Sequence, residues 1–233
     1  TTMPMGGRAG SEFGVTITGQ HLDGTEQLIF SNPSITATPK LKDDGTAIPN
    51  QFRVRIEDDC QAGVYDARVF AALGISSARA FSVGNLPELT QDKKCTTLET
   101  AMEIPVGTTL NATLVDRSVN HYVFDAREGQ QVRIECASKG IDSKMNPVVA
   151  VADSYGSDLI VQRRSGLIDF DVPSDGRYLI KVHDLTFKGG KYYFYRLRVA
   201  EVDANETFER MPTTRSVASY SWPPNRSADC ALL

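Results

Sequence analysis

Apolar and polar residues alternate with a period of two along most of this 233-residue chain. The run "EFGVTITG" places Phe13, Val15 and Ile17 on one side, and "QFRVRIED" repeats the pattern with Phe52 and Val54. Turn residues interrupt these runs at short intervals, and only "CTTLETAMEI" could hold a short helix. The pattern predicts an all-β protein in which each strand buries one face.

The alternation stops once, in "NLPELTQDKKCTTLETA", where proline, aspartate and lysine enter the sequence. We place a domain boundary near residues 85–95 and expect one domain over 1–86 and another over 87–202. Eight or nine predicted strands in roughly 110 residues of the second segment are typical of a sandwich of two antiparallel sheets. Residues 203–233 lack periodicity and are predicted to be a linker or a loosely docked extension, which Trp222 could anchor.

The composition is ordinary for a globular protein, with 41% hydrophobic and 23% charged residues. A formal net charge of -4 argues against a nucleic-acid partner, because such partners require a concentrated basic face. No apolar stretch approaches the roughly 18 residues that span a bilayer, so membrane insertion is not expected. The opening "TTMPMGGRAG" has neither an initiator Met nor signal-peptide regions, so we expect a piece of a longer protein.

The four cysteines are too scattered to form a metal knuckle or a C-x-x-C redox pair. They are Cys60, Cys95, Cys136 and Cys230. Cys136 falls on the apolar side of an alternating strand, where cysteine behaves as a small hydrophobic residue. Mostly free thiols are predicted, although the sequence cannot choose among the three disulfide pairings.

The frame Gly-x-Tyr-x-x-[Arg/Lys]-Val occurs twice, in "AGVYDARV" and in "DGRYLIKV". The pleat of a strand places Tyr65 and Tyr178 on the buried face and the Arg or Lys of the frame on the solvent-facing side. We expect each tyrosine to lie at a core edge and to donate its hydroxyl to the backbone, as tyrosines do near sandwich corners. The flanking segments do not align, so the frame indicates two different sandwiches and not a duplicated module.

The first segment, up to residue 84, resembles the IPT/TIG type of immunoglobulin-like domain. The matching pieces are "GRAGSEFGVTITGQHLDG", "LIFSNPSITATP", "AGVYDARV" and "GISSARAFSVG". Residues 88–200 resemble the bacterial pre-peptidase C-terminal domain, on "GTTLNATLVDRSVNHYVFDAREGQQVRI", "MNPVVAVADSYGSDLIVQ", "FDVPSDGRYLIKVHD" and "YRLRV". The resemblances imply an immunoglobulin-like sandwich followed by a jelly-roll-like sandwich.

Such tandem modules look like parts of large secreted or surface-attached bacterial proteins, where they accompany catalytic domains. The resemblance therefore implies a secreted or cell-surface location, with other domains of the same chain and extracellular protein or polysaccharide as partners. Two functions stay open. One is a non-catalytic binding or spacer module, and the other is an accessory region that assists the secretion or maturation of a peptidase precursor.

Catalysis is not expected in this chain. A triad of Ser165, His183 and Asp153 can be drawn on paper, but no histidine lies in a recognisable catalytic frame. The sequence has no G-x-S-x-G elbow and no H-E-x-x-H motif. A hydrolase is the weakest of the three functions.

The last predicted strand, "KYYFYRLRV", offers a candidate binding surface. The register that buries its other residues turns four side chains outward: Tyr192, Phe194, Arg196 and Arg198. Two aromatic rings and two guanidinium groups form a stripe suited to proteins or glycans. The alternative is that a neighbouring domain, or the tail with Trp222, covers these rings.

Calcium is the one cofactor that the resemblance raises. The resembled family often carries acidic residues before its Tyr-x-Phe strand and at its N-terminal end, and calcium binds such oxygen ligands. The matching residues are Asp116 and Asn120 before Tyr122, with Glu88 and Asp92 at the start of the segment. Asn120 stands where aspartate is common, which lowers the ligand charge. The alternative is that Asp116 and Asn120 only cap a turn.

Overall fold

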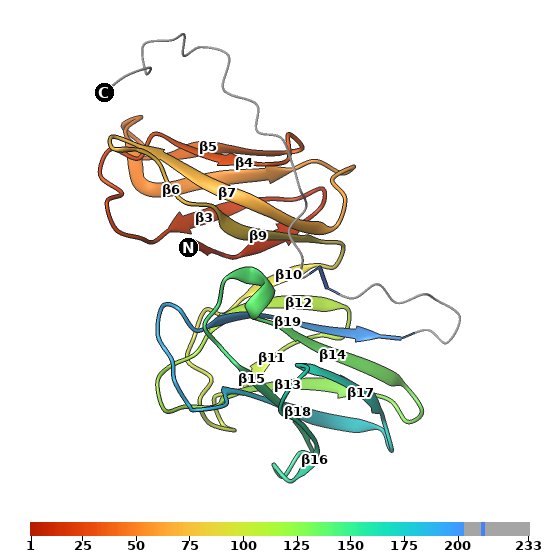
Figure 1. The fold of residues 1–233 in the computed structure, drawn as a ribbon. Helices are drawn as coiled ribbons and strands as arrows, with labels where there is room; N and C mark the ends of the chain where they lie inside the picture. Colours follow the sequence, from red (N-terminus) through yellow and green to blue (C-terminus); the bar gives the residue numbers. More distant parts are fainter. Residues whose placement is uncertain (203–210, 213–233) are drawn as a thin grey trace.

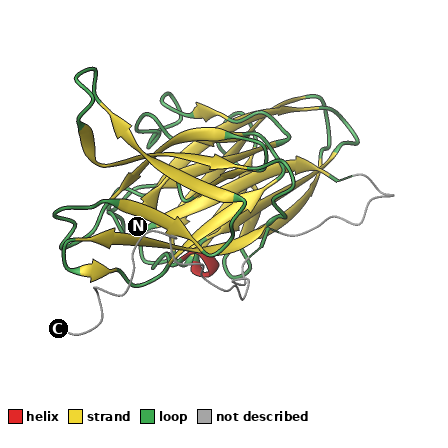
Figure 2. Cartoon of the chain, turned by 90° about the horizontal axis from the view of Figure 1, so that it is seen from above, coloured by secondary structure: helices red, strands yellow, loops and turns green. Residues whose placement is uncertain are grey.

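The computed structural model describes residues 1–202, 211 and 212, and strands make up most of this part of the chain (Figure 1). Its one helix is the single 3-10 turn η1 (Lys139–Ile141), so the stretch "CTTLETAMEI" contains turns and a two-residue strand in place of a helix. No described helix is long and apolar enough to cross a membrane. Figure 2 shows the predominance of strands from above. The predicted all-β fold class is confirmed.

Nine strands form the N-terminal sandwich. They are β1 (Thr2–Met3), β2 (Gly6–Arg8), β3 (Glu12–Ile17), β4 (Gln27–Phe30), β5 (Ile35–Leu41), β6 (Ala47–Ile56), β7 (Gly63–Ala71), β8 (Gly74–Ile75) and β9 (Arg79–Gly84). One sheet has the order β1-β3-β6-β5 and the other β2-β9-β7-β4, with β8 paired to β7. The inward residues of both sheets, among them Phe52, Val54, Phe81 and Val83, form one apolar core.

Ten strands form the C-terminal sandwich. They are β10 (Glu88–Thr90), β11 (Met102–Glu103), β12 (Thr108–Thr113), β13 (Asn120–Ala126), β14 (Gln131–Ala137), β15 (Pro147–Ala152), β16 (Asp158–Gln162), β17 (Leu167–Asp171), β18 (Gly176–Asp184) and β19 (Phe194–Glu201). The sheet orders are β10-β12-β19-β14-β17 and β11-β13-β18-β15-β16. Each sheet is antiparallel except for one short parallel edge strand, β10 or β11, which sequence alternation did not predict.

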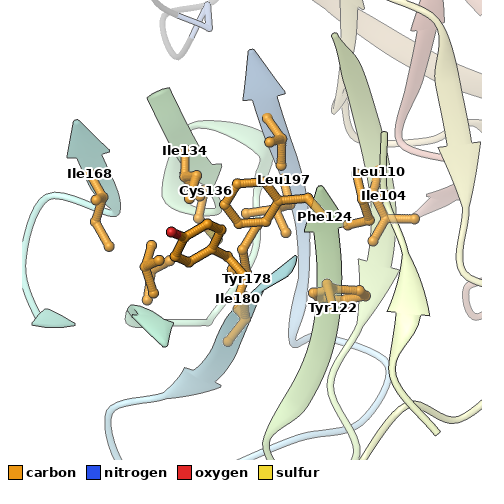
Figure 3. Close-up of a cluster of buried hydrophobic side chains, with 14 of the residues drawn as sticks. Ile104, Leu110, Tyr122, Phe124, Ile134, Cys136, Ile168, Tyr178, Ile180 and Leu197 are labelled. Carbon is orange, nitrogen blue, oxygen red and sulfur yellow. The ribbon is translucent and has the colours of Figure 1, made fainter. Parts of the chain in front are cut away.

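The core of the C-terminal sandwich lies between its two sheets, as Figure 3 shows. Leu110, Ile134 and Leu197 come from one sheet, while Phe124 and Ile180 come from the other. Residues two positions apart on each strand point inward together, because successive side chains in a strand alternate between faces. The period of two in the sequence therefore identified these core residues.

Both tyrosines of the repeated frame lie at the edge of a core. Tyr65 donates its hydroxyl to the carbonyl of Gln61 at 2.7 Å, and Tyr178 donates to the carbonyl of Ser174 at 2.8 Å. In each case the acceptor lies four residues before the tyrosine, and the ring is buried. The prediction of a buried ring with a backbone partner is confirmed in both sandwiches.

The two sandwiches are stacked, and the sheet that contains β12 and β19 faces the N-terminal sandwich (Figure 1). A small apolar cluster joins them, with Met5, Val64 and Ala80 on one side and Ile141 and Phe194 on the other. No described strand pairs across residues 85–87, and the sequence predicts the boundary near residues 85–95. The boundary itself stays a prediction.

Candidate functional site

The last strand, β19, has the predicted alternation but not the predicted exposure. Tyr195, Leu197 and Val199 point into the core, as the register required. Phe194 and Arg196 point the other way, yet they are only 3% and 2% exposed. The expected solvent exposure is therefore wrong for these two residues, and the alternative that a neighbouring domain covers the stripe holds for them. The N-terminal sandwich covers them, and strand alternation cannot reveal what lies against the second face.

Arg196 forms the polar centre of this contact between the sandwiches. Its Nη1 donates to the carbonyl oxygen of Ser82 on β9 at 2.6 Å, and its Nη2 forms an ion pair with Glu88. Asn111 Nδ2 donates to the second oxygen of Glu88 at 2.5 Å. A guanidinium group that donates to a carbonyl and a carboxylate at once fixes both partners in place.

Glu88 is consequently committed to the interface and not available as a predicted calcium ligand. Burial raises the pKa of Glu88 above its ordinary value, and the charge of Arg196 opposes that rise.

The residue at the next outward position of β19, Arg198, also has a partner. Its Nη2 bonds Glu135 at 2.7 Å, and the same carboxylate oxygen accepts the backbone N–H of Met211 at 3.0 Å.

Asn120 lies inside the C-terminal core and does not face a cation site. Its Nδ2 donates to the hydroxyl of Tyr195 at 2.8 Å, to that of Tyr122 and to the carbonyl of Thr113, both at 3.2 Å. The two tyrosine hydroxyls bond each other, and burial raises the pKa of both well above the ordinary range. This side chain therefore joins a buried polar network through its Nδ2, while its Oδ1 is buried without a hydrogen-bond partner in the described part of the chain.

The predicted calcium set does not come together. Asp116 is exposed on the loop after β12, where its Oδ1 accepts the N–H of Gly189 at 3.2 Å, and Asp92 is exposed on another loop. Within residues 1–202, 211 and 212, no three His, Cys, Asp or Glu side chains lie close enough to hold a metal ion. The prediction is wrong in its geometry, because strand register turns Asn120 inward and Arg196 holds Glu88.

The three residues considered as a possible catalytic triad, Ser165, His183 and Asp153, likewise have separate local partners. His183 Nδ1 lies 2.8 Å from the carbonyl of Asp184, and Ser165 bonds the backbone of Leu167. Asp153 accepts the N–H groups of the turn that follows it. None of these contacts joins one member of the triad to another.

A groove of about 900 Å³ between the two sandwiches is the best candidate for a ligand site. The loop after β3, the β7–β8 turn and the residues after η1 line it, together with Tyr192. Tyr192 precedes β19 and is 44% exposed, so of the four predicted binding residues it alone presents an open ring. The backbone N–H of Lys144 donates to the carbonyl of Tyr192 at 2.9 Å, which fixes the position of this tyrosine.

Positive charge surrounds the exposed ring. Lys144 Nζ lies 4.8 Å and Lys191 Nζ 5.0 Å from the centre of the Tyr192 ring, within the range of cation–π attraction. Arg79 also lines the groove, as does one carboxylate, that of Asp142. That carboxylate accepts the backbone N–H of Ala80 at 2.7 Å and so ties the two walls together. The groove therefore combines an aromatic ring with a local excess of ammonium and guanidinium groups.

Sequence reasoning missed most of this groove, because its lining comes from segments far apart in the chain. Leu73 and Ile75 extend from the β7–β8 turn and are exposed, although both are large and apolar. The sequence "AALGIS" places apolar side chains beside a glycine turn, and this pattern could have indicated that Leu73 and Ile75 are exposed. Nothing in the local pattern connects that turn to Lys144 and Tyr192.

The comparisons with known proteins reveal only distant likeness. No family model matches the sequence, and no curated protein matches it. One similar solved structure is PliG, a periplasmic inhibitor of g-type lysozyme from Aeromonas hydrophila, with 16% identity and a TM-score of 0.35 over 49% of this chain and 99% of that one. Another is the pre-peptidase C-terminal domain of a Bacillus anthracis collagenase, with 16% identity and a TM-score of 0.33 over 50% and 99%.

A third similar structure spans more of this chain. It is SGBP-B of a mixed-linkage glucan utilisation locus in Bacteroides ovatus, solved with a heptasaccharide, with 9% identity and a TM-score of 0.26 over 82% of this chain and 70% of that one. The similar structures thus include the pre-peptidase C-terminal type that the sequence resembles, while the IPT/TIG resemblance stays a prediction.

Proposed function

We propose that this chain is a non-catalytic binding module of a secreted or cell-surface protein, and that its ligand lies in the groove around Tyr192. The observation that carries the proposal is an exposed tyrosine ring with two lysine ammonium groups within 5.0 Å of its centre, in a groove walled by both sandwiches. Rigid rings and cationic groups at a concave surface contribute much of the contact energy in recognition.

The charge at the groove favours an acidic polymer. Arg79 and Lys144 line the groove with one carboxylate, Asp142, and Lys191 Nζ lies 5.0 Å from the Tyr192 ring, so a ligand with carboxylate groups gains attraction where a neutral polymer does not. We therefore propose an acidic extracellular polysaccharide as the ligand class. The exposed side chains of Leu73 and Ile75 favour an extracellular protein as the second candidate, because apolar anchors of this kind suit protein partners.

Affinity electrophoresis in gels that contain polygalacturonate, with neutral β-glucan as the comparison polymer, tests this proposal. We expect retardation by the acidic polymer, weakened by salt because exposed charges are screened. Tyr192→Ala should weaken binding roughly tenfold through the lost ring contact, whereas Tyr192→Phe should retain it. Tyr155→Ala is the matched control, since Tyr155 is 89% exposed in the β15–β16 turn, away from the groove.

If Tyr155→Ala weakened binding as much as Tyr192→Ala, the groove would not be the binding site. Binding to neither polymer, with binding to extracellular matrix protein that Leu73→Ala abolishes, would favour the second candidate. Turnover of peptidase, esterase or glycosidase substrates by the purified chain would contradict the non-catalytic assignment. The accessory role in a peptidase precursor stays a prediction from the resemblance.

A further inference from the structure

The edge strand β16 exposes apolar side chains on both of its faces. Leu159, Ile160 and Val161 are 46%, 37% and 43% exposed, and they are consecutive, so they point alternately to the two faces. The strand pairs with β15 on one side only and lies at the end of the molecule opposite the N-terminal sandwich (Figure 1). Its second edge presents unpaired backbone groups beside this apolar surface.

The other described sheet edges have the protections that normally prevent edge-to-edge pairing. Strands β1, β2, β10 and β11 are only two or three residues long, and β4 is four residues long. Strand β5 carries Pro39 and Lys40 beside a shift of register. Strand β17 turns the carboxylates of Asp169 and Asp171 outward. Among the edges in the described part of the chain, β16 alone has three adjacent exposed apolar residues.

The charges at the two ends of β16 are of opposite sign. Asp158 begins the strand, and exposed Arg163 and Arg164 follow its last residue. Lys181 Nζ binds one oxygen of the Asp158 carboxylate at 2.8 Å, and a carboxylate can accept further donors. Charges of a single sign at both ends would repel a second copy of the strand. Opposite signs at the two ends attract a second copy of the strand when that copy runs antiparallel. Asp158 of each copy then lies near Arg163 of the other.

We propose that β16 pairs antiparallel with β16 of a second copy of this chain, across a two-fold axis near Ile160. The two five-stranded sheets would join into one continuous sheet, and the apolar residues on both faces would lose their exposure together. The contact is the same patch on both copies, so it closes as a dimer and does not propagate into a fibre. The groove at Tyr192 lies between the sandwiches, so the dimer would carry two such grooves.

Sedimentation equilibrium of the full chain over a range of concentrations tests the proposal. We expect the mass to rise from one chain to two, and Ile160→Lys to raise the dimer dissociation constant by at least about tenfold, because two ammonium groups would meet near the axis. Leu41→Lys is the matched control, since Leu41 is 58% exposed at the end of β5, and it should leave the mass unchanged.

Arg163→Glu is a second variant that leaves the apolar strand intact. It should weaken the dimer because it places like charges together, and circular dichroism should show an unaltered fold. A wild-type chain that stays monomeric would overturn the proposal, whether or not the edge then binds an extended peptide from another protein. A dimer that persists in Ile160→Lys, or that Leu41→Lys dissociates equally, would overturn it as well.

Discussion

Replacement of Arg196 by methionine should destabilise the protein and uncouple its two sandwiches. The guanidinium group donates to the Ser82 carbonyl at 2.6 Å and forms an ion pair with Glu88, and Arg196 is only 2% exposed. Methionine keeps much of the apolar stem and removes every donor. The variant leaves the Glu88 carboxylate without its counter-charge and removes the side-chain donor to the Ser82 carbonyl.

Removal of one partner from a buried ion pair costs about 3 to 5 kcal/mol, and we expect the loss for Arg196→Met at pH 7 within this range. The cost should depend on pH. Burial raises the pKa of Glu88, so the folded state binds this proton more tightly than the unfolded state, and ionisation of Glu88 lowers stability as the pH rises. Without the charge of Arg196 the pKa of Glu88 rises further, so the loss should be smaller near pH 4 than at pH 7.

Urea unfolding at the two pH values and scanning calorimetry measure these effects. In the variant we expect two separated heat-absorption peaks, because the buried ion pair between the sandwiches is gone and only the small apolar cluster and the Asp142–Ala80 bond still join them. The double variant Arg196→Met/Glu88→Gln should be less destabilised than the sum of the two single variants by about 1 to 3 kcal/mol, since no uncompensated charge remains. A loss below about 1 kcal/mol at pH 7, or an equal loss at both pH values, would refute this account of the interface.

Three further outcomes follow from single residues. Tyr65→Phe and Tyr178→Phe should each cost about 1 kcal/mol in urea unfolding, because each removes one hydroxyl bond to the backbone; equal stability in both variants would show that these bonds contribute nothing net. Gly6→Ala should cost about 1 to 3 kcal/mol, because the added methyl group would collide with the Ser82 carbonyl oxygen, and an unchanged melting temperature would contradict that close approach. Burial raises the pKa of the Cys136 thiol far above its usual range, so iodoacetamide at pH 8 should modify it only after unfolding, as peptide mass spectrometry can show; labelling of the folded chain would indicate an open core.

Free thiols were predicted from the position of Cys136, and the structure agrees where it describes cysteines. Cys60, Cys95 and Cys136 are free and buried. Cys230 and Trp222 lie outside the described residues, as does most of the predicted extension over 203–233. The structure therefore says nothing of a role for Trp222 in covering the rings of the last strand.

The sequence alone determined the fold class and the inward face of the strands in which apolar and polar residues alternate. A period of two places alternate residues on one face, so Tyr195, Leu197 and Val199 could be assigned to the core from local pattern alone. The two tyrosine corners were predictable for the same reason. Their hydroxyl partners lie four residues away in the chain, at Gln61 and Ser174, and such contacts depend on a single turn.

Only the tertiary structure decided what covers the outward faces. Phe194 and Arg196 have the pattern of a solvent-facing stripe, but their partners are Met5, Val64 and Ser82, more than one hundred positions away. Alternation shows only on which face of the sheet a side chain lies. It does not specify which other surface packs against that face. That choice depends on the shape and charge of whole sandwiches, which no local window of sequence contains.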